Sequence, residues 1–157
     1  IFDRPTFRDA ARLRRCLVPI DGYFEWKTEG RQKIPYYFRA ADGGPLAVGG
    51  LWSLQVRPDG TMRRTLCLVT VAPNREAGEV HSRMPVLLTG PQQAAWLAER
   101  AFGPVDFASL AATAPDRALA VHRVSADVNR VACDGPRLIE PVVGAADQPD
   151  FLGDLLG

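Results

Sequence analysis

The stretch Cys16-Leu17-Val18-Pro19-Ile20-Asp21-Gly22-Tyr23-Phe24-Glu25-Trp26 decides the fold. Its first four residues form an apolar run that predicts a short buried strand, and Asp21-Gly22 is a turn signal directly after it. Residues 23–26 are rich in aromatic side chains, which favour a pleated strand, so a second strand is predicted there. The stretch therefore predicts two short strands separated by a turn.

The same alternation of β-prone runs and Gly/Pro turns continues on both sides. Residues 5–15 predict a helix that Thr6 could cap, and residues 27–33 predict a hairpin connection around Gly30. Further strands are predicted at 34–39, 46–52, 65–71, 84–88 and 119–124, helices at 89–97 and 105–112, and a turn or short helix at 125–129. Many short strands with a few helices predict a β-rich α+β domain.

Bulk properties exclude some classes of protein. A chain of 157 residues suits one domain, and no apolar run is long enough to span a bilayer. The net charge of +1 provides no general basic field for nucleic acid. The chain has 17 Arg and 2 Lys among its 19 basic residues. Arg suits phosphate contact, but codon usage in a GC-rich genome is the better explanation of the overall ratio. A nucleic-acid role therefore has to rest on individual positions.

The three cysteines are Cys16, Cys67 and Cys133. Their odd number and wide spacing predict neither a disulfide framework nor a zinc site. We expect each of them to be a small buried hydrophobic residue.

A few polar residues could carry chemistry. Glu25 lies within the aromatic run 23–26, where a charged carboxylate is costly to bury. Glu25 is therefore a candidate for proton transfer. The alternative is a surface Glu on a strand whose aromatic residues point inward. His81 is either an acid–base group or a solvated histidine, and Arg83 beside it could bind phosphate. His122 lies within an apolar strand pattern, and we interpret it as structural.

Five ordered blocks of this sequence resemble the SRAP (SOS response-associated peptidase) domain family, between about Pro5 and Pro141. The first matches the family's R-C-L-x-P-x-D-G-[FY]-[FY]-E-W pattern. The blocks are residues 15–26, Val48-Gly49-Gly50-Leu51-Trp52, Thr70-Val71-Ala72-Pro73-Asn74 with His81-Ser82-Arg83-Met84-Pro85, Val124-Ser125-Ala126-Asp127-Val128-Asn129, and Ile139-Glu140-Pro141. Five blocks in order make chance similarity an unsatisfactory explanation.

The resemblance implies antiparallel sheets in a barrel-like arrangement with flanking short helices. It implies a protein that captures abasic sites in single-stranded DNA as a thiazolidine crosslink through an N-terminal cysteine, and the family is also described as a thiol autopeptidase. Glu25 and His81 would be catalytic, and Trp26 and Arg83 would bind DNA. The resemblance implies no metal or cofactor and no membrane partner. We expect a monomer in the cytoplasm, associated with the nucleoid when bound to DNA.

One departure from the family is informative. The family's nucleophile is a cysteine exposed as the first residue after removal of the initiator Met, and Ile1 does not match it. We therefore expect residues 1–143 to be the C-terminal portion of an SRAP-like domain and residues 144–157 to be an acidic tail. Apolar surface should then be exposed where further strands would join the same sheets.

Two alternatives remain open. The chain could be a truncated, non-catalytic module that binds single-stranded DNA without crosslinking it. It could also be a peptidase that pairs an internal cysteine, Cys16 or Cys67, with His81.

Overall fold

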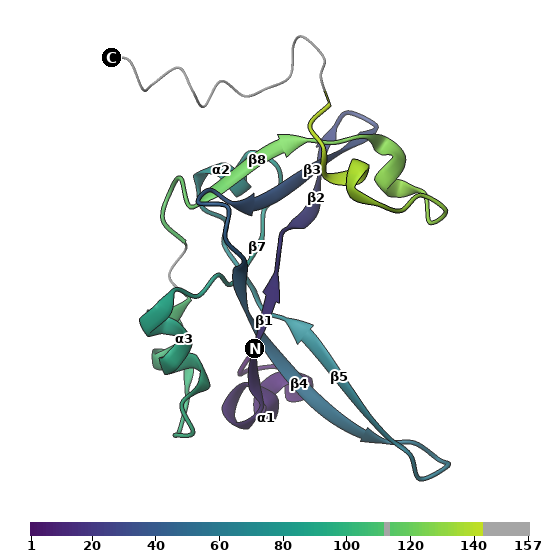
Figure 1. Ribbon diagram of the computed structural model, residues 1–157. Helices are drawn as coiled ribbons and strands as arrows, with labels where there is room; N and C mark the ends of the chain where they lie inside the picture. Colours follow the sequence, from purple (N-terminus) through teal and green to yellow (C-terminus); the bar gives the residue numbers. More distant parts are fainter. Residues whose placement is uncertain (112–113, 143–157) are drawn as a thin grey trace.

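The computed structural model describes residues 1–111 and 114–142, so the predicted tail at 144–157 lies outside the described residues (Figure 1). The regular elements follow one another as short strands and short helices. In chain order they are α1 (Pro5–Leu13), β1 (Arg15–Ile20), β2 (Tyr23–Glu29), β3 (Gln32–Ala40), β4 (Leu46–Val56), β5 (Met62–Leu68), β6 (Thr70–Val71), α2 (Arg75–Gly78), β7 (Met84–Pro85), α3 (Gly90–Leu97), α4 (Pro104–Leu110), β8 (Leu119–Arg123) and the 3-10 helices η1 (Ala126–Asn129) and η2 (Pro136–Ile139).

The strands pair antiparallel in three sheets. The described sheets have the orders β1-β4-β5, β2-β3-β8 and β6-β7. Figure 1 shows the first sheet in the lower half of the molecule and the second in the upper half. The predicted α+β class with antiparallel sheets is confirmed, but in the described residues the sheets do not close into a barrel.

The stretch that decides the fold links the two larger sheets. Its first half is β1, which pairs with β4, and its second half is β2, which pairs with β3. The predicted turn at Asp21-Gly22 lies between them. A side chain at Gly22 would collide with the Phe38 carbonyl and the ring of Tyr37, so only glycine lets the chain cross between the sheets here.

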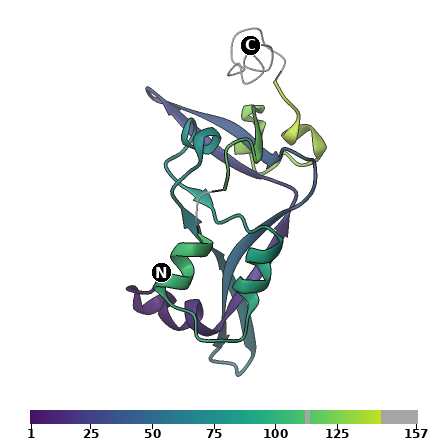
Figure 2. The same ribbon diagram turned by 90° about the vertical axis from the view of Figure 1, so that its left-hand side faces the viewer.

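Two apolar clusters form the core, one for each of the larger sheets. In the first, α3 packs on β1: the fully buried Trp96 donates its indole N–H to the Cys16 carbonyl at 2.9 Å. Figure 2 shows the helices α1, α3 and α4 beside the strands of this lower half. Gly49 makes the packing possible, because a Cβ there would lie 3.2 Å from Val86 and 3.4 Å from Trp96. Core side chains therefore approach the backbone closely at Gly49.

The second cluster lies under β3. Phe38 is fully buried and its ring stacks on that of Tyr23, with 4.8 Å between the centroids and 8° between the planes. Ala77 of α2 and Met84 of β7 close the cluster from the other side. This packing fixes β2, α2 and β7 relative to one another, and the candidate residues come from these elements or their flanks.

Three predicted elements differ in detail. The helix α1 begins at Pro5, so Thr6 is not its N-cap as predicted. Arg4 is the N-cap and makes no side-chain capping bond. This start agrees with the preference of proline for the first helical position. The strand predicted at 65–71 is divided at Val69, whose N–H donates to Gly49 while its carbonyl accepts from Val86. Only two residues of the strand predicted at 84–88 form β7, because Val86 donates to Val69, between β5 and β6, and Leu88 donates to Ala47 of β4.

The expectation that the cysteines are buried is wrong. Cys67 is exposed, and Cys16 and Cys133 are half-buried. Cys67 is exposed because it lies on β5, at the edge of its sheet. His122 has the structural surroundings that we expected: its Nε2 lies 2.8 Å from the Ile139 carbonyl, and its ring packs edge-on against Tyr37.

The longest helix in the described part of the chain, α1, has nine residues, and no described helix is long and apolar enough to cross a bilayer. Among residues 1–111 and 114–142, no group of three or more His, Cys, Asp or Glu side chains is placed to hold a metal ion.

Candidate functional site

Glu25 and His81 lie side by side although 55 positions separate them in the sequence. His81 Nδ1 is 3.9 Å from Glu25 Oε1, and the two side chains are 41% and 29% exposed. Glu25 belongs to β2, an edge strand of its sheet, and His81 lies between α2 and β7. The pair is therefore accessible to a ligand from solvent. The distance between the imidazole and the carboxylate allows electrostatic attraction when the imidazole is protonated.

The backbone around His81 is fixed by a capped helix. The buried Asn74 is the N-cap of α2, and its Oδ1 accepts the N–H of Ala77 at 3.0 Å. The His81 N–H donates in turn to the Ala77 carbonyl at 2.8 Å. The backbone N–H of Asn74 also contacts Met84 Sδ at 3.2 Å, which ties the start of α2 to β7. These contacts hold His81 at the edge of β2.

The imidazole of His81 has a distinct environment at Nδ1. This nitrogen lies 3.2 Å from the backbone N of Arg83 and 3.1 Å from the Arg83 carbonyl. A neutral Nδ1 can accept the Arg83 N–H, whereas a protonated Nδ1 can donate to the carbonyl and attract Glu25. His81 therefore has acceptable partners in both protonation states, as a group that gains and loses protons requires.

Arg83 places a positive charge at the same site. Its Nε and Nη2 donate to Thr70 Oγ1 at 3.2 and 2.9 Å, and Nη2 also donates to the Thr70 carbonyl. These acceptors are neutral, and within the described residues the structure shows no partner for Nη1. An arginine that is oriented on one side and has two free N–H groups on the other is suited to a phosphate oxygen.

Tyr23 forms the apolar back of the site. Burial, followed by the negative charge of Glu25, raises the pKa of the Tyr23 phenol. Tyr23 and Glu25 are two positions apart on β2 and so point to the same face. The phenol is thus a neutral, packed group behind the carboxylate, and no described group hydrogen-bonds to its hydroxyl.

Trp26 does not join this cluster directly. Alternation along β2 points it to the face opposite Glu25, where its indole N–H donates to Asn129 Oδ1 at 2.9 Å. Because β2 is an edge strand, a ligand that runs along this edge could touch both faces. The structure thus brings Glu25, His81 and Arg83 together and places Trp26 around the edge of the same strand.

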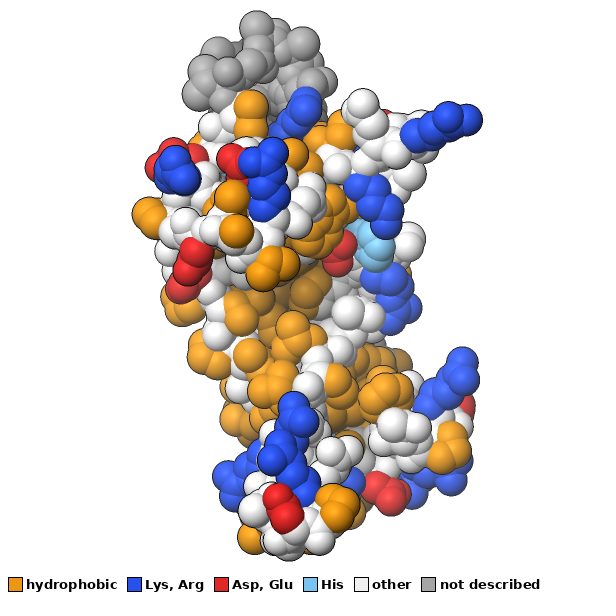
Figure 3. Space-filling model, turned by 90° about the vertical axis from the view of Figure 1, so that its right-hand side faces the viewer, with side chains coloured by type: hydrophobic (Ala, Val, Ile, Leu, Met, Phe, Trp, Pro, Cys, Tyr) orange, Lys and Arg blue, Asp and Glu red, His pale blue; other side chains and the backbone are white. Residues whose placement is uncertain are grey.

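Figure 3 shows this side of the molecule as a surface. A histidine lies beside an acidic side chain, with cationic side chains above and below, at the border of a hollow lined by hydrophobic residues. The charge of the site is therefore local, as expected for a chain whose net charge is only +1.

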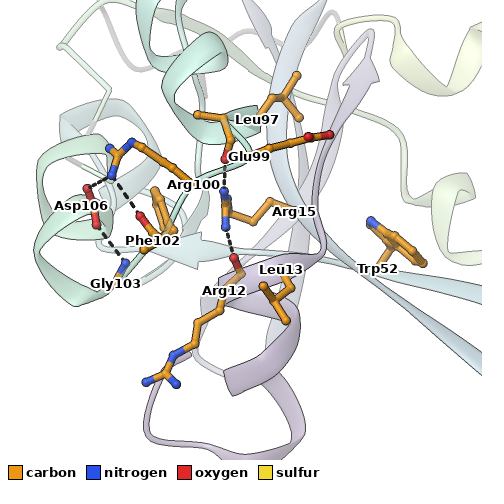
Figure 4. Close-up of a pocket in the computed structure, with 12 residues that line it drawn as sticks. Arg12, Leu13, Arg15, Trp52, Leu97, Glu99, Arg100, Phe102, Gly103 and Asp106 are labelled. Atoms are coloured by element: carbon orange, nitrogen blue, oxygen red, sulfur yellow. Dashed lines mark hydrogen bonds and ion pairs between the residues drawn. The ribbon is translucent and has the colours of Figure 1, made fainter.

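A cavity of about 1030 Å³ lies elsewhere, between α1, β4 and the α3–α4 connection (Figure 4). Its central charge, Arg15, donates to the carbonyls of Trp96 and Ala98 at 2.6 Å each and to that of Arg12 at 2.5 Å. The second arginine, Arg100, pairs with an aspartate at 2.8 Å. These cations are used to join β1 to the helices, so we do not place the chemistry in this cavity. Its lining residues are Arg12, Leu13, Arg15, Trp52, Leu97, Ala98, Glu99, Arg100, Ala101, Phe102, Gly103 and Asp106.

Cys16 is poorly suited to nucleophilic catalysis. Burial, and then the neighbouring Cys67, raise the pKa of the Cys16 thiol. A raised pKa keeps the thiol protonated, which is the reverse of what a nucleophile needs. Both cysteines belong to the β1-β4-β5 sheet, whereas His81 follows α2.

Two residues of the site, Thr70 and Asn129, were not identified as functional from the sequence. Both belong to blocks that resemble SRAP, so a signal was present. Neither is a typical catalytic residue type, however, and their roles depend on contacts with partners 13 and 103 positions away. Only the folded structure shows that they orient Arg83 and Trp26.

Comparisons with known proteins agree with this architecture. The SOS response associated peptidase (SRAP) family matches residues 1–131. Abasic site processing protein YoqW of Bacillus subtilis (strain 168) is 30% identical over 139 residues, which cover 88% of this chain and 62% of the relative. Abasic site processing protein YedK of Escherichia coli (strain K12) is 30% identical over 130 residues, covering 82% and 58%.

A solved structure of a Bacteroides thetaiotaomicron protein superimposes with a TM-score of 0.84 at 26% identity, covering 91% of this chain and 63% of that one. The chain thus spans about three fifths of the length of these curated relatives. The family match extends over most of the described residues and includes the segments that carry Glu25 and His81. The chain belongs to the SRAP family.

Proposed function

We propose that this protein binds single-stranded DNA at abasic sites, that Arg83 and Trp26 hold the strand, and that Glu25 and His81 act on the exposed sugar. The observation that carries the proposal is the 3.9 Å approach of His81 to Glu25 beside an arginine with free N–H groups. The names of YoqW and YedK, abasic site processing proteins, support DNA with abasic sites as the ligand.

The cationic and aromatic groups would hold the strand. Arg83 would bind a phosphate through the N–H groups that Thr70 leaves free. Trp26, held by Asn129, would offer a flat surface for a base next to the lesion, and stacking of this kind is tolerant of sequence. A missing base leaves the deoxyribose accessible, so the sugar can approach the Glu25–His81 pair between these two contacts.

The acid–base pair would act on that sugar. An abasic deoxyribose opens to an aldehyde, which requires removal of the proton from the anomeric hydroxyl and protonation of the ring oxygen. Glu25 can accept and return a proton in this exchange. His81 can assist because Nδ1 has partners in both protonation states.

In a protein that also carries the family's N-terminal cysteine, the aldehyde would form an imine with the α-amine and lose water. Addition of the adjacent thiol to the imine carbon would then close a thiazolidine ring. Glu25 and His81 would supply the proton transfers. We propose residues 1–143 as the SRAP-like domain and residues 144–157 as a tail, acting as a monomer in the cytoplasm and at the nucleoid when bound to DNA.

A second candidate is a module that binds DNA without crosslinking it. The raised pKa of Cys16 favours this alternative over a peptidase that uses Cys16, because that thiol is kept protonated.

The proposal can be tested with Glu25→Gln and a matched control on the same strand, Glu29→Gln. Glu29 is exposed and pairs with Lys27 at 3.3 Å, away from His81. Neither change should alter simple binding of an abasic oligonucleotide. In a protein supplied with the family's N-terminal cysteine segment, Glu25→Gln should slow crosslinking and Glu29→Gln should not. Crosslinking at the wild-type rate with Glu25→Gln would remove Glu25 from the mechanism.

A further inference from the structure

The side chain of Tyr23 ends in a hydroxyl group that has no hydrogen-bond partner among the described residues. The hydroxyl oxygen is shielded from solvent, although the residue as a whole is only half-buried. A buried hydroxyl group is costly unless it takes part in a hydrogen bond. The phenol of Tyr23 therefore needs a partner that a small movement can bring within reach.

The ring of Tyr23 is not free to make that movement. It stacks on the fully buried ring of Phe38, with 4.8 Å between the centroids and 8° between the planes. Tyr23 and Phe38 are also paired directly across β2 and β3, so their side chains share one face of the sheet. A phenylalanine at position 23 would make the same stack. The packing thus explains the ring of Tyr23 but not its hydroxyl group.

Glu25 is the acceptor that the strand places beside this hydroxyl group. The two residues are two positions apart on β2, so their side chains leave the same face with roughly 7 Å between their Cα atoms. Burial, followed by the charge of Glu25, raises the pKa of the Tyr23 phenol, so the two groups interact. The phenol stays protonated at neutral pH and keeps its O–H to donate.

The carboxylate of Glu25 is available to accept this hydrogen bond. Its distance of 3.9 Å from His81 Nδ1 is longer than a hydrogen bond, and within residues 1–111 and 114–142 the structure shows no hydrogen bond to it. The side chain is 29% exposed, so it can change rotamer without repacking the core. Such a rotation would bring one carboxylate oxygen toward Tyr23 and keep the other on the side of His81.

Two cations near Glu25 are engaged by other groups. Arg83 donates to Thr70 through Nε and Nη2. Lys27, which shares the face of Glu25 on β2, pairs with Glu29 at 3.3 Å. The phenol of Tyr23 is thus a donor on this face whose capacity is unused.

We propose that Tyr23 is a positioning residue for Glu25: its phenol donates a hydrogen bond to the carboxylate and holds it toward His81 and the sugar of a bound abasic site. This inference rests on the proposed function, because it adds Tyr23 to the acid–base pair described there. Tyr23 does not touch the DNA and transfers no proton. It limits the orientations that the carboxylate can adopt, and correct orientation of a catalytic group accelerates a reaction.

A double-mutant cycle tests the coupling between Tyr23 and Glu25. The assay is the rate of crosslinking to an abasic oligonucleotide as a function of DNA concentration, in a protein supplied with the family's N-terminal cysteine segment. Tyr23→Phe should lower the rate at saturating DNA about tenfold and leave the half-saturating concentration unchanged. In the Glu25→Gln background, Tyr23→Phe should have no further effect, because the group that it positions can no longer transfer a proton.

Tyr37→Phe is the matched control, since Tyr37 loses the same hydroxyl group on the opposite face of β3, and its rate should equal that of the wild type. A wild-type rate for Tyr23→Phe would overturn the inference. An equal loss in both backgrounds would also overturn it, because a purely structural role of Tyr23 slows both. Failure of the proposed function has a different signature: Glu25→Gln alone would leave the rate unchanged, and the inference would fall with it.

NMR tests the hydrogen bond in this chain without any crosslinking. In a mixture of H2O and D2O, a tyrosine hydroxyl that exchanges slowly gives separate Cζ signals for its O–H and O–D forms, and one that exchanges rapidly gives a single averaged signal. Tyr23 should give separate signals in the wild type and in Glu29→Ala, and an averaged signal in Glu25→Ala. An averaged signal in the wild type, or separate signals in Glu25→Ala, would overturn the inference.

Discussion

Replacing Arg83 with alanine removes the cation that Thr70 orients beside the Glu25–His81 pair. Arginine has five N–H donors. The Nε and Nη2 groups are engaged by Thr70 in three hydrogen bonds, one of them to the Thr70 carbonyl. The two N–H groups of Nη1 therefore remain for one phosphate, and the variant should lose one phosphate contact.

The size of the effect follows from counterion release. One lost contact on single-stranded DNA should flatten the plot of log K against log salt by about 0.7. Between about 50 and 200 mM salt, the wild-type protein should then lose about 2.6-fold more affinity than the variant. Fluorescence anisotropy with a labelled single-stranded oligonucleotide over this range measures both slopes.

Two further variants make the assay decisive. Arg57→Ala removes the same charge at the exposed end of the β4–β5 hairpin, so its slope should equal that of the wild type. Thr70→Val keeps the charge of Arg83 but removes the hydroxyl that orients it, so affinity should fall while the slope stays near the wild-type value. A wild-type slope for Arg83→Ala would refute the assignment of Arg83 to a phosphate.

Three other predictions concern the remaining features. Trp26→Ala should weaken binding of single-stranded DNA by about 1–3 kcal/mol if a base stacks there. Asn129→Ala should weaken it less in the same anisotropy assay, because it removes only the acceptor for the indole N–H. Burial raises the pKa of the Cys16 thiol, so its thiolate forms only at higher pH. At neutral pH, iodoacetamide should therefore modify the exposed Cys67 first, which mass spectrometry of peptides would show. Faster reaction of Cys16 would contradict this. Phe38→Ala should lower the free energy of unfolding by about 3–5 kcal/mol in urea titrations, since the ring is fully buried, and a loss below 1 kcal/mol would contradict this core assignment.

Local sequence rules predicted most of the elements because their signals are local. The helix predicted at 89–97 is an example: Thr89 is the N-cap of α3, and its N–H donates to Gln92 Oε1 at 2.9 Å in a capping box. The predicted hairpin around Gly30 also forms, with Gly30 at a φ of 58°. Residue spacing and turn chemistry are sufficient for such features.

Features that depend on distant partners could not be predicted in this way. Val69 has strong β propensity, but its N–H and carbonyl bond to two different segments, so the strand divides there. The burial of Cys67 was mispredicted because burial depends on whether another strand covers β5, and composition does not reveal that.

The candidate site shows the same limit. Periodicity alone favoured a surface residue at Glu25, and only the resemblance to SRAP singled out Glu25 and His81 together. Their 3.9 Å separation arises from packing of β2, α2 and β7 around one apolar cluster. Thr70 and Asn129 were missed because each acts by orienting another side chain.

Mass spectrometry of this protein mixed with a single-stranded oligonucleotide that carries one abasic site tests the central claim most directly. Under native conditions at low salt, the account predicts a one-to-one complex that disappears as salt is raised. Under denaturing conditions, it predicts the masses of the separate protein and oligonucleotide, because the internal cysteines lack an adjacent α-amine. Absence of the native complex would contradict the DNA-binding site, and a covalent adduct that survives denaturation would reveal a nucleophile that the account does not contain.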